Sequence, residues 1–318
     1  MSTTTTIQSS TLGVMPASAT GSRRVLFACP DMHWPASALL RAGVLAEGLR
    51  DELFVLQVCA PPRTNWRQRH RPDPLFALRR VENLERTRGA AIARCATLLW
   101  PTVPDERILS SEGDFVDAVT QSAAERGVEL IVLPPQCHDC GNTATRIVAS
   151  ARVPVLVARP GRSHNVVVAA TNLADRRYPV LRQARSFGAL LHADLLLVHN
   201  VVPSFVSLSP ETAMLWLAGP PSLQAQLMQR RLAQAAEGLS RCVGTVVKTE
   251  PNTVHAILDA ARQCDADLIV VGVTRSYSRW QRLWGHGVAA RVTQEAQRSV
   301  LLFPVAPPSS ESTAQAAA

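Results

Sequence analysis

The sequence repeats itself, and this repeat restricts the possible folds more than any other feature. The segment RRVLFACPDM, which begins at Arg23, is matched by HNVVVAATNL, which begins at His164. GVELIVLPP is matched by DADLIVVGV, and ARVPVLVARP by QRSVLLFPVA, so the two halves are offset by roughly 140 residues. A repeat of this length is the size of a whole domain and predicts two copies of one domain.

Apolar and amphipathic segments alternate within each half. LIVL at 130–133 and LIVV at 268–271 are continuously apolar, which is typical of parallel strands covered on both faces. SALLRAGVLAEGLR and YPVLRQARSFGALLH carry apolar residues every three or four positions, as a helix with one buried face does. The sequence therefore predicts an α/β fold made of two tandem, doubly wound, parallel-sheet domains.

The expected domain limits follow from the repeat and from its flanks. We expect a first domain at 23–160 and a second at 164–306, joined by the short segment ARPGRSH. A stiff linker of this length keeps the two domains in contact. Residues 1–22 and 307–318 are polar or small and predict disordered tails.

Composition excludes several functional classes. The net charge of +8 comes almost wholly from arginine, because Lys248 is the sole lysine. The arginines are spread along the chain and aromatic residues make up 5%, so we expect a solvated basic surface and no specific nucleic-acid partner. The seven cysteines are an odd number and mostly lie in apolar segments, which indicates a reducing compartment. Without a secretory signal or a long apolar run, we expect a cytoplasmic protein with no membrane partner.

The end of the second half resembles a known family. The segment DADLIVVGVTRSYSRWQRLWGHGVAARVTQEAQRSVLLFPV is similar to the end of a universal stress protein domain, where the fourth strand enters a loop spaced Gly-x2-Gly-x9-Gly-Ser/Thr. Gly272 and Gly285 match the first and third glycines, and Arg275 replaces the second. His286 stands at the hydroxyl position with Gly287 as an insertion, while an alternative register places His286 and Gly287 at the Gly-Ser pair.

The resemblance implies a fold, a ligand and an assembly. Universal stress proteins have a Rossmann-like fold, and members with the intact loop bind ATP through it. Their last strands pair between domains, which here implies an internal pseudo-dimer through VPVLVARP and SVLLFPV. The resemblance implies a stress-response or regulatory binding module rather than a catalyst. It leaves a homodimer and an unknown protein partner open.

The second half is the expected nucleotide site. Backbone N–H groups in a glycine loop and the positive end of the next helix favour phosphate, and Arg275 adds a guanidinium. The family pattern also has an aspartate after the first strand; Asn172 stands near that place in the second half and Asp31 in the first. Asn172 thus joins Gly272, Arg275, Gly285, His286 and Gly287 as candidate ligand residues for ATP or another phosphate compound. The chain carries no Ser-His-Asp order or nucleophile turn, so slow ATP hydrolysis is the most that we expect.

The first half has a replaced loop. Between LIVLPP and Gly141-Asn142 stands only QCHDC, and the two prolines lack N–H donors, so we do not expect ordinary nucleotide binding there. Three interpretations of Cys137 and Cys140 stay open. The thiols are inert, or they form a redox pair at a helix N-terminus, or they bind zinc with His33 and a fourth ligand such as His138, His70 or water.

Overall fold

The computed structural model describes most of the two repeats. The described residues are 24–30, 35–49, 52–59, 74–99, 103–135, 139–160, 166–173, 178–203, 205–206, 215–216, 221–237, 239, 241–274 and 287–305. The segments predicted as disordered tails, 1–22 and 307–318, lie outside them.

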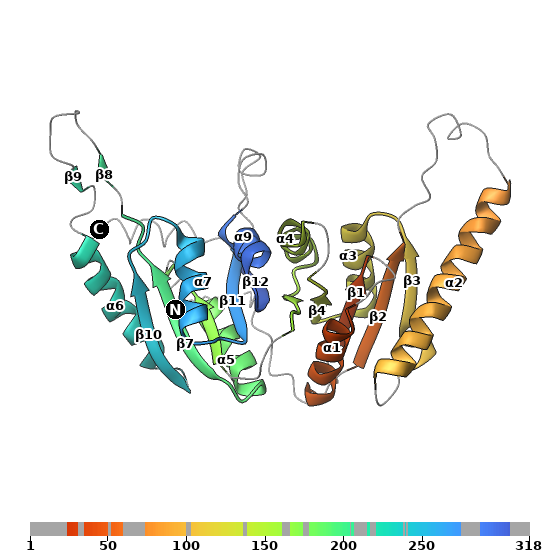
Figure 1. Ribbon diagram of the computed structural model, residues 1–318, viewed down its shortest axis with the longest axis horizontal. Coiled ribbons are helices and arrows are strands. Elements are labelled where there is room, and N and C mark those ends of the chain that lie inside the picture. Colours follow the sequence, from red (N-terminus) through yellow and green to blue (C-terminus); the bar gives the residue numbers. More distant parts are fainter. Residues whose placement is uncertain are drawn as a thin grey trace, which may run out of the picture.

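Ten strands form one sheet in the order β10-β7-β6-β11-β12-β5-β4-β1-β2-β3 (Figure 1). In the first half they are β1 (Arg24–Cys29), β2 (Glu52–Cys59), β3 (Ile108–Glu112), β4 (Leu130–Leu133) and β5 (Val155–Val157). In the second half they are β6 (Val166–Ala170), β7 (Asp194–Asn200), β10 (Cys242–Lys248), β11 (Leu268–Thr274) and β12 (Ser299–Val305). A separate short hairpin pairs β8 (Phe205–Val206) with β9 (Leu215–Trp216).

Within the ten-stranded sheet, the strand pairs inside each half are parallel, and the halves meet through one antiparallel pair, β5 with β12. Val157 of β5 lies opposite Val300 of β12, and Leu156 lies opposite Leu301. This pairing confirms the predicted internal pseudo-dimer and the two doubly wound sheets. It also covers two strand edges that would otherwise offer unpaired backbone groups to another chain. We keep 23–160 and 164–306 as the proposed domain limits.

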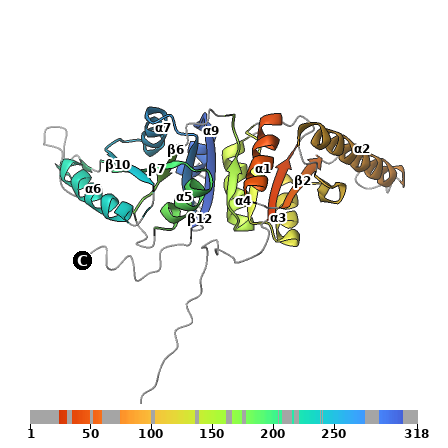
Figure 2. The same cartoon turned by 90° about the horizontal axis from the view of Figure 1, so that it is seen from below.

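Helices cover both faces of the sheet. The helices of the first half are α1 (Ala36–Leu49), α2 (Pro74–Leu98), α3 (Phe115–Arg126) and α4 (Cys140–Ala151). Those of the second half are α5 (Pro179–Leu190), α6 (Pro221–Glu237), α7 (Thr253–Gln263) and α9 (Val288–Glu295). One buried cluster holds side chains of α3, α4, α7 and α9, and the other holds side chains of α1, α2, α5 and α6. At the centre of the molecule α4 and α9 lie side by side (Figures 1 and 2).

The strand registers on both sides of the first strand give the offset between the halves. Val25 of β1 pairs with Leu130, which begins LIVL, and Val167 of β6 pairs with Leu268, which begins LIVV, so β1 lies 142 positions before β6. On the other side, β2 pairs with β1 and β7 with β6 at the same offset. Burial supports the same offset, because Leu39 and Leu181 are both fully buried on their helices. Sequence similarity had paired Arg24 with Asn165. The one-residue difference arises because continuously apolar strands lack the alternation that fixes a register.

Among the described residues, no helix is both long and apolar enough to cross a membrane.

Candidate functional site

In the second half, β6, β7 and β11 end at the same edge of the sheet, and α9 begins there. The chain turns sharply after β6: the Leu173 N–H donates to the Thr171 hydroxyl over 3.1 Å, and Leu173 is left-handed with φ 56°. Leu173 is buried while Asn172 is exposed, so this turn presents the Asn172 side chain at the sheet edge. Parallel α/β sheets bind ligands at this edge, and the turn therefore belongs to the candidate site.

A buried histidine supports the turn from the neighbouring strand. His199 of β7 is 9% exposed, and its Nδ1 lies 2.7 Å from the carbonyl oxygen of Thr171. Since a carbonyl only accepts, Nδ1 carries the proton. Burial lowers the pKa of His199 below its ordinary value of 6.5; the hydrogen bond to Thr171 raises it, and the nearby Arg231 lowers it. His199 is thus a neutral residue that positions the turn.

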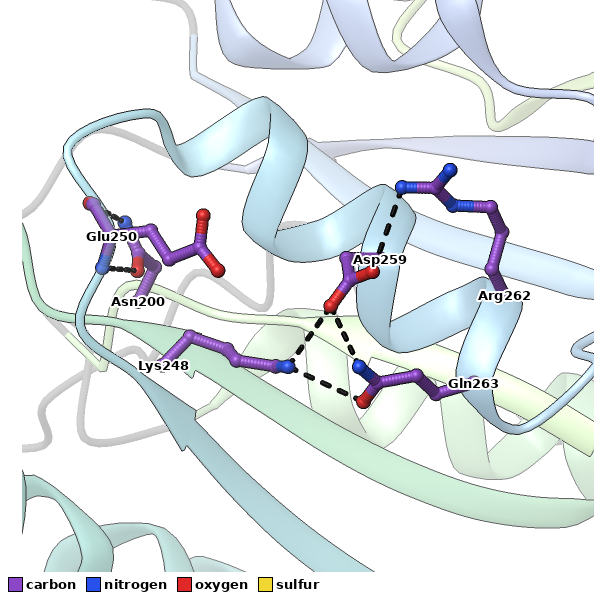
Figure 3. Close-up of polar contacts among 6 residues, drawn as sticks. All are labelled: Asn200, Lys248, Glu250, Asp259, Arg262 and Gln263. Atoms are coloured by element: carbon purple, nitrogen blue, oxygen red, sulfur yellow. Dashed lines mark hydrogen bonds and ion pairs between the residues drawn. The ribbon is translucent and has the colours of Figure 1, made fainter.

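A second polar group fixes the loop between β10 and α7 (Figure 3). The Asn200 side chain accepts from the Glu250 N–H over 3.0 Å and donates to the Glu250 carbonyl over 2.9 Å. At the other end of this group the Lys248 ammonium lies 3.1 Å from Asp259 and 3.3 Å from Gln263. These contacts tie the end of β7 to β10 and α7. They account for Lys248 as a structural residue of the sheet edge.

Gly272 of β11 is needed for packing. A Cβ atom built at Gly272 would lie 2.8 Å from Cγ2 of Val180 and 2.8 Å from Cγ2 of Val305. Val180 belongs to α5 and Val305 to β12, so the glycine lets a helix and a strand close over β11. The first glycine of the family pattern therefore has a role in this chain that requires no ligand.

The N-cap residue of α9 offers no side-chain acceptor to its own helix. Gly287 is the N-cap, and among the described residues no side chain accepts from the first N–H groups of the helix. Unpaired N–H groups and the helix dipole give such an end a partial positive charge. Of the predicted ligand residues, Asn172, Gly272 and Gly287 thus lie at one sheet edge. Arg275, Gly285 and His286 lie outside the described residues.

The first half closes the corresponding helix end. A Cβ atom at Gly141 would lie 2.1 Å from the carbonyl oxygen of Ala290, so α4 touches the backbone of α9 at this point. The Gly141 N–H donates to Oε1 of Gln294 over 3.3 Å. The N-cap Asp139 is left-handed, with φ 54°, and its carboxylate accepts from Asn142 over 2.7 Å. The second half thus supplies partners where a phosphate would bind.

Sequence reasoning missed Ala290 and Gln294, because both act across the junction of the halves. In the sequence, Gly141-Asn142 directly follows the shortened loop of the first half. A glycine that begins a helix next to another helix is a signal of close helix packing, and this meaning explains Gly141.

Of the two cysteines in the first-half loop, the structure describes Cys140. Cys140 is 2% exposed, and its thiol lies 3.8 Å from the carbonyl oxygen of Pro134, so solvent reaches it poorly. Cys137 and His33 lie outside the described residues. Within the described ranges, no three histidine, cysteine, aspartate or glutamate side chains gather as a metal site would require.

Comparison with known proteins identifies the second half. Residues 163–304 match the model of the universal stress protein family. This half belongs to that family. The first half repeats the strand order of this universal stress protein domain, with the fifth strands of the two halves side by side. No curated protein matches the chain in sequence.

Solved structures share the tandem architecture. A protein of unknown function from Pseudomonas aeruginosa PAO1 is 17% identical, with a TM-score of 0.56, 89% of this chain covered and 92% of that one. A universal stress protein from Archaeoglobus fulgidus is 15% identical, with a TM-score of 0.56, 88% of this chain covered and 96% of that one. At these identities the likeness is one of fold, and it extends over both halves.

Proposed function

We propose that the universal stress protein domain of the second half binds a phosphate-bearing nucleotide, with ATP the first candidate, and that the first half does not. The observation that carries the proposal is the N-terminus of α9, whose first N–H groups have no acceptor side chain among the described residues and which begins at the same sheet edge as the exposed Asn172. In the first half the matching helix end donates to Gln294 and packs against Ala290.

The chemistry of the second edge suits an anion with a sugar. The first N–H groups of α9 and its dipole favour phosphate oxygens. Arg275 and His286, which lie outside the described residues, stand in the sequence between β11 and α9 and would supply a guanidinium and a ring N–H if they reach the ligand. Asn172 offers both a donor and an acceptor to a ribose. Because the set contains no nucleophile paired with a base, we assign the site to binding and regulation in the cytoplasm.

Calorimetric titration of the purified chain with ATP tests the proposal. We expect one saturable site for each chain, and Asn172→Ala should weaken it by about fivefold, the effect of one lost hydrogen bond. Asn142→Ala in the first half is the matched control and should leave the affinity unchanged. No binding heat, two sites, or an equal loss in Asn142→Ala would each contradict the proposal.

A further inference from the structure

A cavity lies between the two halves, away from the sheet edges at which β6 and β11 end and α4 and α9 begin. It has a volume of about 450 Å³ and is bounded by α1, by the chain just after β5, and by the starts of β6 and β11 with the end of α5. In Figure 1, α1 and α5 lie on either side of the central strands at the lower side of the view. Cavities of this size hold ordinary small ligands.

Apolar side chains form most of the cavity wall, and two of them are exposed. Leu40 is 43% exposed and Val44 is 64% exposed, one turn apart on α1. Leu45, Val167 and Ala193 continue the wall and belong to the buried cluster of that face. Exposed apolar residues that join a cavity mark a binding surface more often than scattered ones do.

The second half shows that the fold does not need apolar residues at the positions of Leu40 and Val44. At the offset of 142 positions, Arg182 of α5 corresponds to Leu40, and Ser186 to Val44. Both counterparts are exposed, and the Ser186 hydroxyl donates to the Arg182 carbonyl over 3.1 Å. The same helix face is therefore polar in one half and apolar only where it borders the cavity.

Three charged residues border the cavity, and they differ in how they would interact with an anionic group of a ligand. Arg41 of α1 is half-buried, and no described residue forms a hydrogen bond or ion pair with its guanidinium. Arg159 points its guanidinium to the other face of the sheet, where Nη2 donates to the Thr293 carbonyl over 2.8 Å. Asp267 is 7% exposed, and its carboxylate disfavours an anionic group beside it. An anionic group in the cavity would therefore pair with Arg41.

We propose that this cavity, which we call the α1 cleft, binds an amphipathic monoanion: an unbranched or ring-bearing apolar body with one carboxylate or sulfate head. The body lies against Leu40, Val44 and Val167, and the head pairs with Arg41. This site is independent of the proposed nucleotide site, which lies at the end of β6 and the start of α9.

Titration calorimetry with decanoate, below its micelle concentration, tests the α1 cleft in the full chain. We expect one saturable site for each chain. Hexanoate should bind more weakly, because each buried methylene tightens binding by up to about fourfold. Decyl sulfate should compete with decanoate, whereas decyltrimethylammonium should bind at least about tenfold more weakly, because its head carries the same charge as Arg41.

The variants copy the second half into the first. Leu40→Arg with Val44→Ser should lower the affinity for decanoate at least about tenfold, because the two side chains no longer provide an apolar wall. Arg41→Gln should weaken the binding of decanoate. It should also reduce the difference in affinity between decanoate and decyltrimethylammonium. Arg182→Gln is the matched control, because it removes an exposed arginine at the corresponding helix and should change nothing. Leu40, Val44 and Arg41 are at least partly exposed, so urea midpoints should stay at the wild-type value.

Each of the other outcomes overturns the proposal. These are the absence of saturable binding, equal affinity for the two head-group charges, and an unchanged affinity in Leu40→Arg with Val44→Ser. A further such outcome could come from sedimentation of the unliganded chain. If the chain is a dimer and Leu40→Arg with Val44→Ser makes it a monomer, the apolar surface binds a second copy of the chain.

Discussion

The two halves have one fold but treat the helix after their fourth strand in opposite ways. In the first half α4 begins at Cys140 against the backbone of α9, and its Gly141 N–H has a partner in Gln294. In the second half α9 begins at Gly287 with no described side chain on its first N–H groups. One copy uses this helix end as a contact between domains, whereas in the other no described side chain takes that place. Duplication allows such a division, because the single nucleotide site that we propose requires only one of the two copies.

Glycine has a different packing role at each of the two edges. Gly141 lies against a carbonyl oxygen of the neighbouring helix, which cannot move without moving the helix. Gly272 lies against two valine methyl groups, which can rotate or shift. The difference between a rigid and an adjustable neighbour predicts the order of the effects below.

The largest effect is expected for Gly141→Ala. A methyl group 2.1 Å from the Ala290 carbonyl oxygen must separate α4 from α9, so the free energy of unfolding should fall by about 3 kcal/mol. Urea denaturation measures this. Gly89→Ala on α2 is the control, because nothing lies within 4 Å of its added Cβ, and a helix gains up to about 1 kcal/mol from the exchange. Equal stability of the two variants would mean that α4 and α9 do not meet closely at Gly141.

A smaller effect is expected for Gly272→Ala. The added methyl group lies 2.8 Å from Val180 and Val305, so we expect a loss of about 1–2 kcal/mol in the free energy of unfolding. Val180→Ala should relieve one of these two contacts and leave that with Val305, so the double variant should be more stable than the sum of the single effects predicts.

The same double variant separates packing from binding at Gly272. If the glycine serves packing, ATP affinity should return to the wild-type value when stability returns. An ATP affinity that stays low in the stable double variant would instead show that the ligand needs the glycine itself.

The sequence was sufficient for the two doubly wound domains, and the family resemblance implied the pairing of the halves. The domains follow from local patterns: the repeat defines two equal domains, and continuous apolar segments such as 130–133 define buried parallel strands. The site was predicted less completely, because its features depend on contacts between distant segments. Gly141 meets Ala290 across 149 positions of sequence, and no local pattern at either residue reports that contact. For the same reason, the exposed Leu40 and Val44 on α1 indicate a binding surface only when they are compared with their counterparts Arg182 and Ser186.

The smallest effect is expected for an exchange at the corresponding buried positions Gln57 and His199. Gln57, 2% exposed, stands 142 positions before His199, and it carries no titrating proton. Because burial lowers the pKa of His199 below 6.5, the unfolded chain binds a proton before the folded chain does as the pH falls. His199 therefore costs stability below about pH 6.5 and nothing above it.

His199→Gln should remove this acid-side loss while the amide still donates to Thr171. We expect the variant and the wild type to have similar urea midpoints at pH 7.5, and the variant to have the higher midpoint at pH 5.5. The reverse exchange, Gln57→His, should add a second loss of the same sign, because that position is equally enclosed. Parallel pH profiles for His199→Gln and the wild type would mean that the His199 ring accepts its proton in the folded chain as readily as in the unfolded one. The His199 ring would then be neutral at pH 7.5 and would become charged beside Thr171 below about pH 6.5, where the second edge would become more favourable to phosphate.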